Sequence, residues 1–81
     1  MFDYTISKDN SSEIFADACN RIRESFPDYI PNPLLVDVDG STIQVFYKNG
    51  TSTTVYDDYD NGAVFVISDI DLNNLFGTYI K

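Results

Sequence analysis

The sequence predicts an α+β fold: a four-stranded antiparallel meander plus an N-terminal strand, with one amphipathic helix packed on one face and a short C-terminal helix. Two observations lead to this class. A long helix-spaced apolar stripe follows an alternating N-terminal segment, and three Asp-Gly or Asn-Gly dipeptides then separate strand-like segments. Apolar residues make up 43% of the 81 residues, enough for a core, so residues 1–81 are expected to form a single domain. The predicted element order is β-α-β-β-β-β-α.

The first strand and the long helix have clear signals. Residues 2–6 alternate between apolar and polar side chains, as a half-buried strand does. Asn10 is the expected N-cap of the helix, with Glu13 reaching back to its backbone in a capping box. Pro27 ends the helix. The apolar stripe consists of Ile14, Phe15, Ala18, Cys19, Ile22 and Phe26.

The second half of the chain reads as a meander. After an extended, proline-rich connection over residues 27–33, strands are expected at 34–38, 42–47, 51–56 and 63–68. The turns are Asp39-Gly40, Asn49-Gly50 and a longer acidic loop that ends in Asn61-Gly62. Ser68 or Asp69 is expected to cap a short C-terminal helix that Gly77 ends. Residues 78–81 are candidates for a few further strand residues.

Two-residue turns fix the register of the meander and predict which face meets the helix. They place Val36 opposite Ile43, Ile43 opposite Tyr56, and Tyr56 opposite Ile67, although the third loop also fits four or more residues. The face assigned to the helix is Leu34, Val36, Ile43, Val45, Tyr56, Phe65 and Ile67. The opposite face carries Leu35, Phe46, Val55, Val64 and Val66 beside Asp37, Gln44 and Thr53. Because that second face is also rich in apolar residues, either the C-terminal segment covers it or it is a dimer or partner surface.

Charge and composition exclude most catalytic chemistry. Thirteen acidic residues, eleven of them aspartates, face five basic ones, which gives a net charge of −8, and there is no histidine. Zinc sites and Ser-His or Cys-His nucleophiles are therefore excluded, no Gly-rich phosphate loop exists, and neither an enzyme activity nor a cofactor is expected. Cys19 is expected to be an unreactive, buried helix residue.

The same charge bears on location and partners. Neither a signal peptide nor a membrane-spanning stretch is expected from the residue pattern, and negative charge disfavours anionic membranes and direct nucleic-acid binding. The expected location is cytoplasmic, and the expected partner is a basic protein surface.

Aspartates at i and i+2 form a recurring pattern. In extended backbone such side chains lie about 6.6 Å apart on one face, and DNA phosphates are spaced by about 3.4 Å along each strand, so the paired carboxylates are expected to imitate a coarse row of phosphates. Tyr59 stands between two of these aspartates at a predicted loop tip, where interface tyrosines are common. Turn chemistry and solubility are the alternative explanation, and a weak cation site at Asp57, Asp58 and Asp60 is a third. The pairs are Asp37/Asp39, Asp58/Asp60 and Asp69/Asp71.

The run from Tyr56 to Asp60 and the other aspartate pairs resemble the acidic surfaces of phage-encoded anti-defence proteins, including anti-CRISPR and other DNA-mimic inhibitors. This resemblance implies that the protein blocks the nucleic-acid-binding groove of a host nuclease or CRISPR-type effector complex. Asp57, Asp58, Tyr59 and Asp60 are then expected to form the centre of the contact, and Asp37, Asp39, Asp69 and Asp71 are expected to support it.

Two other functions fit the same sequence. An immunity protein that neutralises a nuclease toxin is also small and acidic. A structural or assembly protein would self-associate, as a homodimer or larger oligomer, through the second sheet face.

Overall fold

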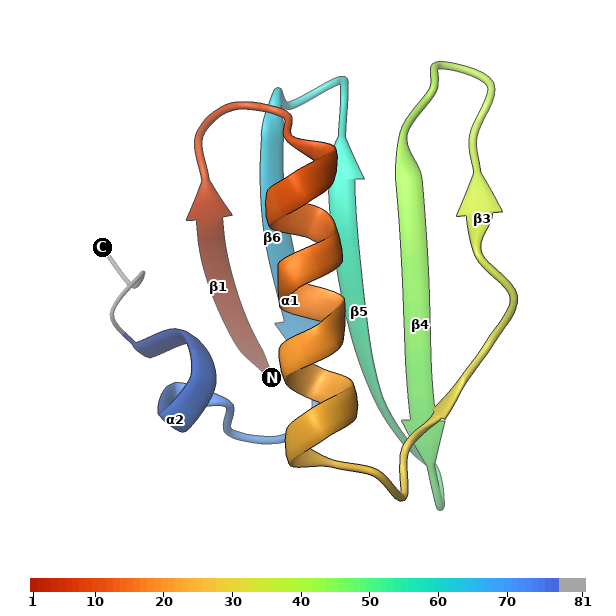
Figure 1. The fold of residues 1–81 in the computed structure, drawn as a ribbon, viewed down its shortest axis with the longest axis vertical. Coiled ribbons are helices and arrows are strands. Elements are labelled where there is room, and N and C mark those ends of the chain that lie inside the picture. The colour runs from red at the N-terminus through yellow and green to blue at the C-terminus, as the bar shows by residue number, and fades with distance from the viewer. Residues whose placement is uncertain (78–81) are drawn as a thin grey trace.

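The computed structural model describes residues 1–77, which fold into a six-stranded antiparallel sheet with two helices on one of its faces (Figure 1). The α+β class is therefore confirmed. The expectation of further strand residues at 78–81 lies outside the described residues. The elements are β1 (Phe2–Ser7), α1 (Ser12–Ser25), β2 (Ile30–Pro31), β3 (Leu35–Val36), β4 (Thr42–Lys48), β5 (Thr51–Asp58), β6 (Ala63–Ser68) and α2 (Asn73–Phe76).

The strand order in the sheet is β1-β6-β5-β4-β2. Strand β3 also pairs with β4, on the same edge as β2 but at the other end of β4. Strands β3 to β6 form the expected meander, and the N-terminal strand joins it beside β6. The connection expected over residues 27–33 contributes the two-residue strand β2, while the strand expected over 34–38 shortens to β3. Short strands and prolines at this edge leave little backbone for another chain to pair with.

The long helix begins one residue later than the sequence suggested. The N-cap is Ser11, whose hydroxyl accepts a hydrogen bond from the backbone N–H of Ile14 at 3.2 Å. The prediction of Asn10 as the cap is wrong, because the Asn10 amide donates to Asp57 and to the Asp58 carbonyl instead. The predicted apolar stripe is confirmed for its buried members, which are Phe15, Ala18, Cys19 and Ile22.

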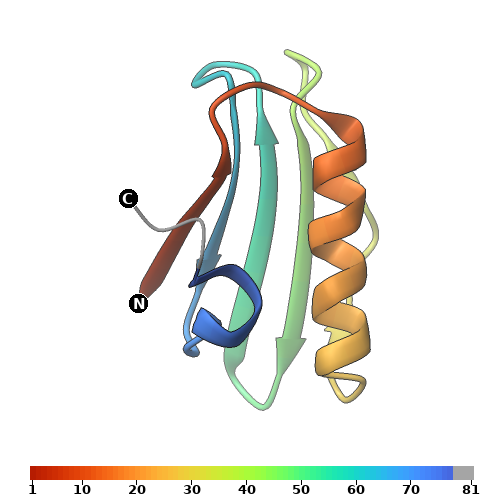
Figure 2. The same ribbon diagram turned by 60° about the vertical axis from the view of Figure 1, so that its left-hand side comes forward.

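The face of the sheet that packs against α1 is the opposite of the one predicted. Phe46, Val55, Val64 and Val66 are fully buried beneath the helices, as is Tyr4 from β1. Ile43, Val45, Tyr56, Phe65 and Ile67, which were assigned to the helix, point away from it and are only half-buried. Leu35, assigned to the other face, shares their side because it lies opposite Ile43. Both helices lie on the same side of the sheet in Figures 1 and 2. The helix-facing side of the strands also holds buried polar residues, which are Gln44, Thr53, Asp57 and Ser68, and Ser41 is buried in the loop before β4.

Polar residues on a buried face are stable only when their hydrogen bonds are satisfied. Thr53 and Ser68 share a hydrogen bond of 2.8 Å between their hydroxyls, and the Gln44 amide donates to the Asn32 carbonyl at 2.6 Å. Within residues 1–77, every buried side-chain nitrogen and oxygen has a partner. These positions therefore belong to the interior despite their polar character.

The strand register expected from the Asp-Gly and Asn-Gly turns is right at one turn and differs at the other two. Asn49 and Gly50 both have positive φ, as a two-residue type I′ turn requires, and the expected pairing of Ile43 with Tyr56 is confirmed. At the first turn Leu35, not Val36, lies opposite Ile43, so that register is wrong by one residue. At the third turn Tyr56 lies opposite Phe65, not Ile67, because the loop holds four residues, 59–62.

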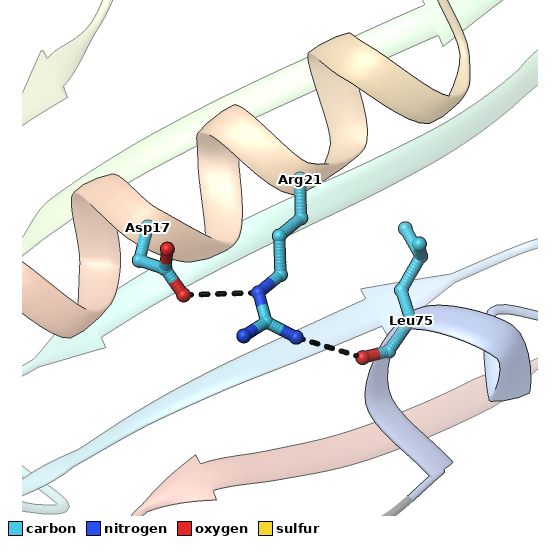
Figure 3. Close-up of polar contacts among 3 residues, drawn as sticks. All are labelled: Asp17, Arg21 and Leu75. Atoms are coloured by element: carbon cyan, nitrogen blue, oxygen red, sulfur yellow. Dashed lines mark hydrogen bonds and ion pairs between the residues drawn. The ribbon is translucent and has the colours of Figure 1, made fainter.

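The C-terminal helix is shorter than expected and packs beside α1. Its N-cap is Leu72, whose side chain forms no capping bond, so Ser68 and Asp69 are not the caps. Leu72 and Phe76 are buried with Tyr4, whose hydroxyl accepts the Leu72 backbone N–H at 2.8 Å. Arg21 of α1 pairs with Asp17 at 3.0 Å and donates to the Leu75 carbonyl at 3.3 Å, which ties the two helices together (Figure 3).

Candidate functional site

Three loops meet at one end of the sheet: residues 8–11 after β1, 37–41 after β3, and 59–62 after β5 (Figure 1). There the carboxylates of Asp39, Asp58 and Asp60 converge, with one oxygen of each lying within 4.8 Å of the others. We call these three residues the acidic cluster. Asp39 comes from the 37–41 loop, whereas Asp58 ends β5 and Asp60 lies in the loop after it, so the fold, rather than a local motif, assembles the cluster.

Tyr59 and Gly40 hold the two loops of the acidic cluster together. The Tyr59 backbone N–H donates to the Ser41 hydroxyl at 2.9 Å. The Tyr59 ring lies against Gly40, where an added Cβ would sit 2.9 Å from a ring carbon. Gly40 also has a φ of +90°, in the region that side chains avoid. Both the contact with Tyr59 and the positive φ therefore require glycine at position 40. Tyr59 still exposes 52% of its surface beside the cluster.

Hydrogen bonds from the backbone orient two of the three carboxylates. Asp58 accepts the Asp60 N–H and the Asn61 side-chain amide, each at 2.9 Å. Asp39 accepts the Ser41 N–H at 2.9 Å, and this bond, with the Ser41 side chain, holds the pKa of Asp39 below its usual value. Asp60 is exposed, and within residues 1–77 its carboxylate accepts no hydrogen bond. The cluster therefore has two carboxylates fixed by local hydrogen bonds and presents Asp60 outward.

Basic residues do little to neutralise this end of the molecule. The two ion pairs within residues 1–77 join Arg21 to Asp17 and Lys48 to Asp28, both away from the cluster. Lys8 lies in a loop at the same end and forms no ion pair there within the described chain. Three converging carboxylates without a cation repel one another, so an ammonium, a guanidinium or a divalent metal ion would relieve the repulsion.

Asp57 takes no part in this surface, although the sequence placed it at the centre. It alternates to the helix-facing side of β5, is buried, and accepts a hydrogen bond from the Asn10 amide at 2.8 Å. The expected cation group of Asp57, Asp58 and Asp60 is therefore wrong in one member, since Asp39 takes the place of Asp57.

The remaining aspartates are spread between the two ends. Asp37 lies in the same loop as Asp39 but turns its carboxylate to the Val38 N–H at 2.7 Å. Asp69 and Asp71 lie beyond β6 at the opposite end of the sheet. Asp69 accepts the Ser52 N–H and Asp71 accepts the Asn73 N–H, each at 2.8 Å. None of the three aspartate pairs lies within one strand, so the expected row of phosphate-like charges along extended backbone is wrong.

Sequence reasoning missed the contributions of Gly40, Ser41 and Asn10 to this end of the fold. The Asp39-Gly40 dipeptide predicted that Gly40 lies in a turn. Its contact with Tyr59 could not be predicted, because it depends on two loops that pack together only in the folded chain. Asn10 resembled a helix cap because Asn and Ser are both good caps, and only the fold shows that Asn10 bonds to β5.

A groove of about 310 Å³ opens at the other end, between the end of α1 and the β4–β5 turn. Phe26, Tyr29 and Ile70 line it, and the Lys48–Asp28 ion pair borders it at 3.0 Å. The volume of this groove lies at the lower end of the range for small-ligand pockets, and its lining offers no nucleophile paired with a base.

Comparison with protein-family models, curated sequences and solved structures finds no match for this chain. Among residues 1–77, no helix combines the length and hydrophobicity needed to cross a lipid bilayer.

Proposed function

We propose that this protein is a small acidic inhibitor that binds a basic protein surface, blocking the nucleic-acid-binding site of a host nuclease or CRISPR-type effector without catalysis. The convergence of Asp39, Asp58 and Asp60 beside the exposed Tyr59 is the observation that carries the proposal. A compact group of three carboxylates fits a lysine or arginine side chain of the partner, and an adjacent tyrosine adds an amphipathic contact.

The geometry favours a local contact over an extended imitation of the DNA backbone. Five of the six paired aspartates accept local or cross-strand backbone N–H groups, so turn chemistry explains much of their positioning. Asp60 is the exception, and it lies in the cluster. Inhibition would then follow from occupying one basic side chain and covering the groove around it, with the net charge of −8 speeding the encounter.

The first prediction concerns capture of a target that normally binds nucleic acid. Immobilised protein is incubated with a nuclease-treated bacterial lysate at low and high salt, and the bound protein is identified. We expect a basic nucleic-acid-binding protein that is retained at low salt only. Adding the purified inhibitor should displace a labelled nucleic acid from that target.

The control is a pair of charge reversals of equal size. Replacing an acid by lysine raises the net charge by two, from −8 to −6, for either Asp60→Lys or Glu24→Lys. Asp60 lies in the cluster, whereas Glu24 is exposed on α1. Capture should be lost with Asp60→Lys and kept with Glu24→Lys. A target that binds its nucleic acid and this protein simultaneously would refute the blocking function, and a captured nuclease toxin would place the protein in the immunity class.

A further inference from the structure

The outer face of the sheet, opposite the helices, is apolar at its centre. We define it by the half-buried residues Ile43, Val45, Tyr56, Phe65 and Ile67. An antiparallel sheet with one solvent-facing side ordinarily carries polar residues on that side. Both helices of residues 1–77 pack on the other face (Figure 2), so within the described chain no helix covers these side chains, which shield one another only in part.

The register joins these residues into one continuous patch. In one row, Leu35, Ile43, Tyr56 and Phe65 are direct cross-strand neighbours. Four neighbouring strands spaced by about 4.8 Å give this row a width of about 14 Å. The adjacent row places Val45 and Ile67 on either side of Thr54. The Tyr56 and Phe65 rings stack with centroids 4.7 Å apart, which makes a preorganised aromatic centre.

Acidic residues border this patch. Asp58 follows Tyr56 on the same side of β5 and brings the acidic cluster to one end of the outer face. Asp3 of β1 lies opposite Ile67 and places a second carboxylate along the side. Among the strand positions of residues 1–77 that point to this side, none is a lysine or an arginine. The outer face therefore has an apolar centre with an anionic border, the arrangement of a protein interface with a charged rim.

We infer that the outer face binds a partner surface whose apolar centre is bordered by lysine or arginine side chains. The inference rests on the proposed function and extends it from the acidic cluster to the sheet beside it. A second copy of this chain fits poorly, because it would bring a further charge of −8 and the same acidic border. Charge complementarity thus selects a basic partner over self-association.

The test uses two synthetic peptides of equal length and equal positive charge, one alternating lysine with leucine and the other alternating lysine with serine. Binding is followed by chemical shifts of the protein's backbone amides. We expect the lysine–leucine peptide to bind about tenfold more tightly. Its shifts should cover the outer strand positions as well as the acidic cluster.

Matched variants on the two sides of the molecule separate the outer face from a general effect of hydrophobicity. Ile67→Thr should reduce the preference for the leucine peptide, while the same change at Ile14, on the exposed side of α1, should leave it intact. Thr54→Val fills the polar gap between Val45 and Ile67 and should tighten binding of the leucine peptide. Because Thr54→Val keeps a β-branched side chain, its result does not depend on tolerance of a disruptive substitution.

Three results would count against specific parts of this account. Equal binding of both peptides, with shifts confined to residues 37–41 and 58–62, would overturn the inference and leave the proposed function standing. Binding that Asp60→Lys leaves unchanged would contradict the proposed function, although a retained leucine preference would still support the apolar contact. A wild-type dimer that Ile67→Thr dissociates would show that the outer face binds a second copy, which overturns the inference.

Discussion

At the scale of single residues, several aspartates of this protein accept hydrogen bonds from the backbone next to them. Asp37, Asp39 and Asp58 each accept an N–H within three residues in sequence, as turn aspartates commonly do. Asp60 differs because its exposed carboxylate accepts no hydrogen bond in the described chain. The aspartate count by itself is therefore a weak sign of binding, and the position of Asp60 within a three-carboxylate cluster is a stronger one.

The single cysteine gives a prediction at this scale. Burial in the core raises the pKa of the Cys19 thiol to about 11, against a smaller opposing effect of the Arg23 charge. A rise of about two pH units lowers the thiolate fraction at neutral pH about 100-fold, and burial adds steric protection. We expect a disulfide reagent to react with Cys19 at neutral pH far more slowly in the native protein than in urea.

The same pKa fixes the sign of a pH effect. Above pH 9 the unfolded thiol loses its proton while the folded thiol keeps it, so the free energy of unfolding should fall as pH rises from about 9 to about 11. Cys19→Ala removes this contribution and provides the control. Equal labelling rates in the native and unfolded protein would contradict the buried position of Cys19.

At the scale of elements, strand and helix positions were predictable, but the choice of sheet face was not. The stripe of α1 and the positive-φ turn at Asn49-Gly50 have strong local signals, and both are confirmed. Strands β4 to β6 are apolar on both faces, so alternation cannot say which face meets a helix. The buried face also includes the polar residue Thr53, whose hydroxyl shares a buried hydrogen bond with that of Ser68.

The sequence pattern predicted several acidic residues of the candidate site, but not which three of them come together. The sequence placed Asp57, Asp58, Tyr59 and Asp60 in one loop with Tyr59 at its tip. The structure keeps Tyr59 and Asp60 in the loop, while β5 extends through Asp58. Asp39 joins Asp58 and Asp60 because the 37–41 loop packs against Tyr59, and Asp57 is absent because β5 extends past it and turns it to the helix-facing side. Successive side chains of a strand point to opposite faces, so the length of β5 decides which acids reach the cluster.

The start of α1 gives a prediction at the element scale. Ser11 caps the helix, whereas Asn10 binds the buried Asp57. Ser11→Ala should lower the free energy of unfolding by about 1 kcal/mol, and Ser11→Gly by only a few tenths. Asn10→Ala should cost about 1–3 kcal/mol, because it removes a hydrogen-bond donor from a buried carboxylate. These losses are measurable by urea unfolding.

The reverse ranking would restore Asn10 as the cap. In that case Asn10→Gly would be tolerated, as glycine generally is at an N-cap, and Ser11→Ala would have little effect. Pairing Asn10→Ala with Asp57→Asn in a double-mutant cycle gives a further check, since contacting residues should show a coupling energy.

At the scale of the whole molecule, the protein has two unlike faces and two unlike ends. The helices and the core lie on one side of the sheet, and an apolar outer face lies on the other (Figures 1 and 2). The acidic cluster occupies one end, while the ion pairs of Lys48 and Arg21 lie elsewhere. Charge reversals at the two ends should therefore have different effects on binding, even though they change the net charge equally.

The most direct test of the central claim is the salt dependence of affinity for the captured target. Wild-type protein, Asp60→Lys and Glu24→Lys are compared across a range of ionic strengths. We expect the wild type to weaken as salt rises, Asp60→Lys to bind about tenfold more weakly at low salt with a shallower salt dependence, and Glu24→Lys to follow the wild type. Wild-type affinity that does not respond to salt, or equal losses in the two variants, would contradict recognition through the acidic cluster.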